Sequence, residues 1–319
     1  MKKYQHYING EWIDSAGNEL IAVVNPATEE VIGEISAANK DDIGLAVAAA
    51  KTAYESRVLV DMNPMERAKL MRSIADELRK VSKDGGALLC EENGKLLGAS
   101  EYEFLDAANY FDYYSGLTDK IEGQTIPVNN QVMDYTLYEP YGVSGHIVPW
   151  NFPISMLARS LACSFAAGNS TVIKPAELTP LATTSFFAQA IHNAGVPKGL
   201  INIVTGYGVE AGAALTSHDD VAQITFTGSV KTGKTILHAA AERAVPAVVE
   251  LGGKSAAVVL PDADIDKVVN ATKVGIFSQA GQICSAMSRM IVHKSIKDIH
   301  QDIKKILEDN KVGEKIRDG

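Results

Sequence analysis

The sequence contains little cysteine, and its cysteines are not clustered. Three cysteines occur in 319 residues, and no two of them form a C-x-x-C pair. This spacing excludes a disulfide framework and a cysteine-based zinc site, and it fits a reducing compartment. The seven histidines show no metal-ligand spacing either, so we expect no metal site.

The chain also lacks clustered positive charge and long apolar runs. Its formal net charge is −9, whereas binding to phosphate backbones needs a clustered basic face, so nucleic acid is excluded as the main partner. No run approaches the about 20 apolar residues of a membrane-spanning helix, and the first residues do not resemble a signal peptide. We therefore expect a cytoplasmic protein without membrane contact.

A regular alternation of strand and helix patterns is present instead. Asn9-Gly10 between apolar residues predicts an entry hairpin over 7–12, and helical spacing dominates from Asp41 to Tyr114. Beyond Tyr141, predicted helices separate predicted strands at 143–148, 171–173, 201–204, 222–226 and 247–250. This order predicts an α/β fold with a mainly parallel, nucleotide-binding sheet and helices on both of its faces.

Two further segments complete the predicted organisation. Residues 121–140 alternate in character and predict an extended two-strand excursion. A second α/β unit begins at 256–260 and continues with a helix over 265–279. We therefore predict a cofactor domain over 1–252 and the start of a second domain over 253–319.

Cys284 is the candidate nucleophile. It lies just past Gly281 and Gln282, among small residues that let a substrate approach the backbone. A thiol attacks as thiolate, so such a site needs positive potential, backbone donors or a base. Glu250, at the end of an apolar strand before two glycines, is the candidate base. Cys90 and Cys163 lack such neighbours and are interpreted as structural.

Three glycine-rich stretches are candidate phosphate loops. Residues 206–212, which include Gly208, imitate a dinucleotide fingerprint, but the last glycine comes one residue late. Gly228–Thr235 satisfies the P-loop pattern, with Lys234 before Thr235. This leaves a P-loop nucleotide hydrolase as an alternative. Phe226-Thr227-Gly228-Ser229, between a strand and a helix, is a general anion site, because a helix N-terminus attracts negative charge.

Polar residues also follow the first two strands of the predicted parallel sheet. Asn151 lies between Pro149 and Pro153, a rigid mount for a hydrogen-bond donor, although such a residue is usually a turn residue. Lys174 could donate to ribose hydroxyls, and Glu177 could accept from a 2′-hydroxyl while repelling a 2′-phosphate. A solvated ion pair is the alternative interpretation of these last two residues.

Two motifs 34 positions apart, Glu250-Leu251-Gly252-Gly253-Lys254 and Gly281-Gln282-Ile283-Cys284, carry a family resemblance. Together with the Pro-Trp-Asn-Phe-Pro segment at 149–153, they resemble the aldehyde dehydrogenase superfamily over essentially the whole chain. The resemblance implies a Rossmann-like NAD domain followed by the first part of a catalytic domain. It also implies that 121–140 bridges subunits of a homo-oligomer.

The same resemblance implies a role for each candidate residue. An aldehyde would be oxidised to a carboxylic acid: Cys284 attacks it, Asn151 and the Cys284 backbone N–H stabilise the oxyanion, and Glu250 activates water against the thioester. Arg159 could bind a substrate carboxylate, but an Arg on a helix surface is an equally good interpretation, so the choice of aldehyde stays open. The implied cofactor is NAD, with contacts from Pro149, Trp150, Lys174, Glu177, Gly208, Phe226, Thr227, Gly228, Ser229 and Leu251.

The chain departs from the family at two places. Gln279 stands where relatives usually have Asn, in the loop before Cys284. Relatives also continue well beyond Gly319, and their later residues include a Glu and a Phe that position the nicotinamide ribose and ring. An inactive, truncated subunit is therefore a third interpretation.

Overall fold

The computed structural model describes residues 2–17, 19–296 and 299–309. The chain divides into two compact units, Met1–Val249 and Glu250–Gly319. Residues 310–319, the end of the predicted second domain, lie outside the described residues.

A seven-stranded sheet forms the centre of the first unit, in the order β12-β11-β8-β9-β10-β2-β3. Strands β8, β9, β10 and β11 pair in parallel, and the hairpin β2–β3 joins β10 antiparallel. The strands are β2 His6–Ile8, β3 Glu11–Ile13, β8 Val143–Ile147, β9 Ser170–Lys174, β10 Ile201–Ile203, β11 Val221–Gly228 and β12 Ala247–Leu251. The predicted α/β fold with a mainly parallel sheet is confirmed.

The strand order creates a topological switch beside β8. The chain adds β9 and then β10 on one side of β8, and it returns to add β11 and β12 on the other side. Right-handed crossovers therefore place the helices before and after the switch on opposite faces of the sheet. In open α/β sheets, ligands bind outside the carboxyl ends of the strands at such a point.

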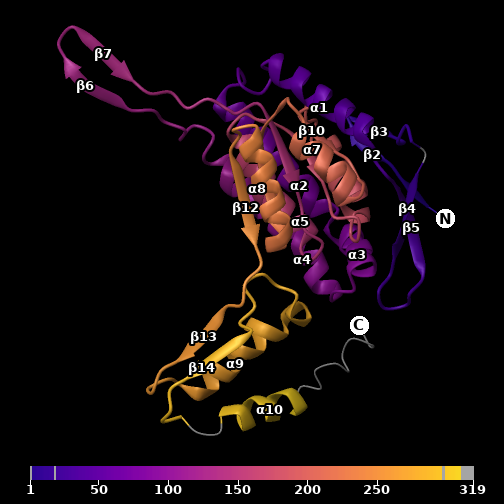
Figure 1. Ribbon diagram of the computed structural model, residues 1–319, viewed down its shortest axis with the longest axis vertical. Coiled ribbons are helices and arrows are strands. Elements are labelled where there is room, and N and C mark those ends of the chain that lie inside the picture. Colours follow the sequence, from indigo (N-terminus) through magenta and orange to yellow (C-terminus); the bar gives the residue numbers. More distant parts are fainter. Residues whose placement is uncertain (1, 18, 297–298, 310–319) are drawn as a thin grey trace. The chain divides into compact units, whose positions relative to one another are not determined.

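The helices of the first unit form two groups (Figure 1). Helix α5 packs on β8 and β9 and is covered by α2 and α4, whereas α1, α7 and α8 pack with one another and on the sheet. The α-helices are α1 Lys40–Glu55, α2 Pro64–Lys80, α3 Ser82–Asn93, α4 Leu97–Ser115, α5 Pro153–Ala166, α6 Ala188–Asn193, α7 Ala213–Ser217 and α8 Val230–Glu242. Two π-helical turns, η1 Thr183–Phe187 and η2 Gly208–Gly212, precede α6 and α7.

The predicted helical stretch from Asp41 to Tyr114 is interrupted between α3 and α4. Gly94 has φ +78°, so it ends α3 in the left-handed conformation that glycine adopts most readily. The next helix begins at Leu97, which leaves Lys95 in a short connection. Phe104 and Phe111 of α4 are fully buried against Phe165 of α5 in the main core.

Two smaller sheets accompany the main one. The first has the order β1-β5-β4, from β1 Lys3–Tyr4, β5 Val31–Ser36 and β4 Leu20–Val24. The second is the hairpin of β6 Thr125–Asn129 and β7 Val132–Tyr135, which extends away from the sheet and helices of the first unit (Figure 1). The two-strand excursion expected over 121–140 is therefore present, and each residue of its two strands is exposed.

The described part of the second unit contains a parallel strand pair, two α-helices and a short 3-10 turn, Ser278–Gly281. Strands β13 Ala256–Val259 and β14 Arg289–Val292 pair in register, and α9 Ile265–Phe277 lies between them in the chain. Helix α10 spans Ile299–Asp309. Across the described parts of both units, no helix has the length and apolar character that a membrane span requires.

We expect His146, at the centre of the main sheet, to make the fold sensitive to acid. Its ring is 1% exposed with Nδ1 2.9 Å from Ser160 Oγ, and burial lowers its pKa from 6.5 to about 4. Below pH 6.5 the unfolded chain binds a proton here that the folded chain does not bind until about pH 4. The free energy of unfolding should therefore fall between these pH values, by up to about 3 kcal/mol.

Urea unfolding from pH 7 to pH 4.5 would measure this effect. In His146→Leu the fall should be smaller by about 2 kcal/mol, because leucine does not titrate. His238→Gln, at an exposed position of α8, is the control and should follow the wild type. An equal fall in wild type and His146→Leu would contradict the assignment.

Candidate functional site

Three parallel strands end together at the switch point. Phe226 of β11 lies opposite Ile147 of β8, which lies opposite Lys174 of β9. Residues 148–152 and 175–179 leave this edge of the sheet after β8 and β9, and β11 ends at Gly228, one residue before Ser229 and α8. The structure therefore gathers most of the predicted cofactor residues of the first unit at one edge, where an α/β sheet binds ligands.

Lys174 and Glu177 form a pair at this edge. Lys174 is 2% exposed, and its Nζ donates to Glu177 Oε2 at 2.9 Å. Burial lowers the pKa of Lys174, and the neighbouring Glu177 carboxylate opposes that effect. The side chain of Lys174 also passes beside η2, since a Cβ added at Gly212 would lie 3.8 Å from its Cδ. The ammonium group is thus enclosed at the sheet edge, and the solvated surface pair considered from the sequence is wrong.

The N-terminus of α8 supplies an anion site at the same edge. Ser229 is the N-cap residue, and its Oγ accepts a hydrogen bond from Thr232 N at 3.1 Å. The positive end of this 13-residue helix therefore lies directly after β11. Gly228 is needed before the cap, because a Cβ there would lie 2.5 Å from the Phe226 ring.

The same helix argues against the P-loop alternative. Because α8 begins at Val230, the later P-loop residues Gly233, Lys234 and Thr235 are already helical. A P-loop needs a glycine-rich turn long enough to wrap around phosphates before its Lys and Ser or Thr. The geometry is that of a helix N-terminus after a strand and does not favour a P-loop.

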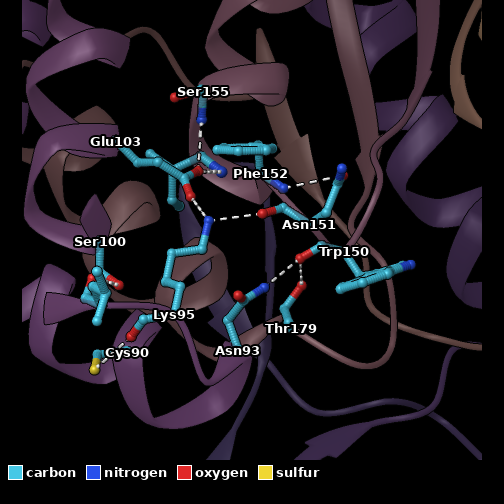
Figure 2. A network of polar contacts seen from close by, with 12 residues as sticks. Cys90, Asn93, Lys95, Ser100, Glu103, Trp150, Asn151, Phe152, Ser155 and Thr179 are labelled. Carbon is cyan, nitrogen blue, oxygen red and sulfur yellow. Dashed lines mark hydrogen bonds and ion pairs between the residues drawn. The ribbon is translucent and has the colours of Figure 1, made fainter. Parts of the chain in front are cut away.

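The segment with Asn151 is held by side chains from other parts of the first unit (Figure 2). The Trp150 carbonyl accepts hydrogen bonds from Asn93 Nδ2 at 2.7 Å and Thr179 Oγ1 at 3.0 Å. The Asn151 carbonyl accepts one from Lys95 Nζ at 2.7 Å. Two successive peptide groups are thereby fixed at the end of β8.

The Asn151 amide has a defined orientation. Its Oδ1 accepts a hydrogen bond from Phe152 N at 3.1 Å. A backbone N–H requires an acceptor, so this contact identifies the oxygen end of the amide. The other end of the amide is Nδ2, which can donate, and the role of Asn151 as oxyanion donor stays a prediction.

Lys95 and Glu103 form a buried ion pair beneath this segment, and neither residue was among the candidates predicted from the sequence. Their side chains are 0% and 3% exposed. Burial lowers the pKa of Lys95 and raises that of Glu103, and the attraction between the two groups opposes both shifts. Glu103 carried a usable signal, since it lies on the buried face of α4 with Phe104 and Ala107. Lys95 carried none, because it lies between helices.

Arg159, the predicted substrate residue, is half-buried on α5. It is near Tyr110 of α4, where burial raises the pKa of the phenol and the Arg159 charge opposes this shift.

Two of the three cysteines belong to the first unit. Cys163 is exposed, and Cys90 donates from Sγ to the Lys95 carbonyl at 3.0 Å. The described residues include no cluster of acidic, histidine and cysteine side chains that could hold a metal ion.

Cys284 lies in the second unit, on a loop that folds back against α9. It is exposed, and Met287 N after it donates to the Gly275 carbonyl at 2.9 Å. The predicted helix over 265–279 ends at Phe277, because Gln279 and Ala280 have φ of 51° and 52°. Left-handed backbone is unusual for such residues, and Asn tolerates it better than Gln.

The second unit also brings the Glu250 turn to Cys284. Glu250 and Leu251 end β12, and the turn Gly252-Gly253 follows. A Cβ added at Gly253 would lie 3.8 Å from the Cys284 carbonyl oxygen, so the two loops run close together. Glu250 is exposed, whereas Leu251 is half-buried. Asn151 belongs to the first unit, and Glu250 and Cys284 belong to the second.

Comparisons with known proteins identify relatives of this chain. A model of the aldehyde dehydrogenase family matches residues 12–319. Aldehyde dehydrogenase family 2 member B4 of Arabidopsis thaliana, a mitochondrial protein, is 43% identical over 92% of this chain and 55% of its own length. Aldehyde dehydrogenase 1A1 of Mesocricetus auratus is 40% identical over 92% of this chain and 59% of its own length.

Solved structures show the same similarity. The NAD+ complex of an aldehyde dehydrogenase from Bacillus cereus superimposes with a TM-score of 0.94 at 38% identity, over 97% of this chain and 63% of that one. Betaine aldehyde dehydrogenase from Staphylococcus aureus, also with NAD+, gives a TM-score of 0.92 at 35% identity, over 96% of this chain and 61% of that one. The chain thus spans less than two thirds of the length of these relatives.

Proposed function

The chain belongs to the aldehyde dehydrogenase family, and we propose that it oxidises an aldehyde to a carboxylic acid with NAD. The observation that carries this proposal is the shared carboxyl edge of β8, β9 and β11 at the topological switch point. In an open α/β sheet such an edge is where a dinucleotide cofactor binds, and hydride transfer requires the cofactor close to the reacting carbonyl.

The residues at this edge fit a dinucleotide. The pyrophosphate would lie at the N-terminus of α8, received by Gly228 and Ser229. Lys174 and Glu177 would bind the adenosine ribose, and the carboxylate favours NAD over NADP. The remaining proposed contacts are Pro149, Trp150, Gly208, Phe226, Thr227 and Leu251. When bound, NAD accepts the hydride that leaves the substrate carbon.

Cys284 would form the covalent intermediate. Its sulfur bonds to the aldehyde carbon, and the carbonyl oxygen becomes an oxyanion that accepts hydrogen bonds from Asn151 Nδ2 and the Cys284 backbone N–H. Loss of hydride from that carbon leaves a thioester on Cys284. The exposed position of Cys284 and the oriented amide of Asn151 support these two roles.

Glu250 would complete the cycle as a general base. It removes a proton from a water molecule, which attacks the thioester carbon and releases the carboxylic acid with the Cys284 sulfur as leaving group. The close approach of the turn after Glu250 to Cys284 supports this role. Arg159 supports the proposal that the substrate aldehyde carries a carboxylate, because guanidinium groups bind carboxylates in a bidentate manner.

The exposed hairpin β6–β7 supports association between copies of the protein. It presents the apolar side chains of Val128 and Met133, which are 56% and 83% exposed. Exposed apolar groups that extend from a domain favour an interface. We propose that this hairpin bridges subunits of a homo-oligomer.

Turnover should depend on Cys284 absolutely and on Asn151 strongly. NADH formation, followed by absorbance with aliphatic, aromatic and carboxylate-bearing aldehydes, should vanish in Cys284→Ala. In Asn151→Ala it should fall by about 10²–10³, the usual effect of losing one oxyanion donor. Cys163→Ala is the matched control and should keep wild-type activity. Turnover by Cys284→Ala would disprove the proposed mechanism.

The cofactor preference should depend on Glu177. In Glu177→Gln the ratio of kcat/KM with NAD to kcat/KM with NADP should fall by about tenfold, because the carboxylate that repels a 2′-phosphate is lost. Glu242→Gln, at the far end of α8, controls for the change in net charge. An unchanged ratio in Glu177→Gln would refute the assignment of Glu177 to the ribose.

Association should depend on the hairpin. Sedimentation velocity should show an oligomer for wild type and a shift towards monomer for Val128→Asp/Met133→Asp, because charge at an apolar interface opposes association. A wild type that sediments as a monomer at every concentration would count against the proposed role of the hairpin.

A further inference from the structure

We propose that Lys95 and Glu103 are positioning residues for the oxidation, acting through the backbone that carries Asn151. This inference rests on the proposed function, in which Asn151 donates to the oxyanion. In this proposal the Asn151 amide is held in place by Lys95, which lies in the connection between α3 and α4.

Lys95 directs its ammonium group to the segment after β8. Its Nζ contacts Glu103 Oε1, donates to the Asn151 carbonyl at 2.7 Å and lies 4.2 Å from the centre of the Phe152 ring (Figure 2). An ammonium group has three donors and no acceptor. The charge of Lys95 is therefore engaged by its partner carboxylate and by two consecutive residues of the loop.

Glu103 holds the other side of the same loop. Its Oε2 accepts hydrogen bonds from Ile154 N at 3.1 Å and Ser155 N at 3.2 Å, at the start of α5. These N–H groups have no partner within the helix, so the carboxylate satisfies them and interacts favourably with the helix dipole. The ion pair thus links the carbonyl of Asn151 to the first turn of α5.

The prolines of the loop restrict its backbone but remove hydrogen-bond donors. Pro149 and Pro153 flank the segment and have no N–H to donate, so fewer backbone hydrogen bonds can hold its peptide groups. Side chains of Asn93, Thr179 and Lys95 supply the donors to its carbonyl groups instead. Because a misplacement of about 1 Å can lower a rate by about 10², this support bears directly on catalysis.

The test uses the double variant Lys95→Met/Glu103→Gln. A single substitution would leave one buried charge without its partner and could prevent folding, whereas removing both charges avoids this. Methionine fills the volume of lysine without its ammonium group, and the amide oxygen introduced by Glu103→Gln can still accept from an N–H of α5. The matched control is Lys198→Met/Glu11→Gln, which removes a pair of exposed side chains joined at 2.8 Å.

We expect the double variant to keep the wild-type melting temperature within a few degrees. Its kcat should fall by about 10² with little change in KM, because the Asn151 amide acts on the oxyanion of the transition state. Adding Asn151→Ala should then lower kcat by less than about tenfold, since residues that act as one unit are not additive. Wild-type kcat in the double variant, or the full effect of Asn151→Ala in its background, would overturn the proposal.

Hydrogen–deuterium exchange provides a readout that needs no turnover. The amides of residues 150–152, 154 and 155 should exchange about tenfold faster in the double variant than in wild type and in the control. Unchanged exchange overturns the positioning role whether or not the protein is active. A wild type with protected amides but no aldehyde oxidation counts against the proposed function alone.

Discussion

The register between β8, β9 and β11 is the constraint on which the first unit depends. Because these strands run parallel, they end at one edge, and each is followed by a segment with polar residues. A shift of one residue in β9 would turn the Lys174 side chain to the other face of the sheet. The Lys174–Glu177 pair, the N-terminus of α8 and the Asn151 segment all derive their common location from this pairing.

Side chains from outside the sheet fix the orientation of the residues at this edge. The edge of the sheet brings Asn151 to the right region, but the side chains of Asn93, Lys95 and Thr179 fix its peptide groups. These residues lie far from Asn151 in the chain, so the loop depends on the packing of α3 on α4 and of α4 on α5. The helical layer outside the sheet is therefore part of the site.

Much of the fold could be predicted from local sequence patterns. The five predicted strands after Tyr141 correspond to β8 to β12, because apolar runs between turn signals carry enough information to locate strands. Local patterns failed where tertiary contacts decide the structure. The break at Gly94 lies within an otherwise helical pattern, and Lys95 has a clear role only once Glu103 and Asn151 are near it in space.

The residues of the candidate site also differ in how well the sequence predicts them. Motifs identified Cys284, Glu250 and Asn151 as candidates, since each lies in a short stretch of distinctive residues. The P-loop pattern at Gly228–Thr235 was ambiguous because a P-loop and a plain helix N-terminus after a strand both attract an anion, so the pattern does not identify the ligand. Likewise, the burial of Lys174 depends on η2, which is about 35 residues away in sequence.

The place of Glu250 on β12 has a consequence for solubility. Among the described strands of the main sheet, β12 is an outermost one, and Val248 on it is 53% exposed. Exposed apolar edges invite other chains to add strands, and a charged side chain on the edge opposes this. A neutral substitution of Glu250, the proposed general base, would remove a negative charge from this exposed edge, so we expect it to change the colloidal behaviour of the protein together with its chemistry.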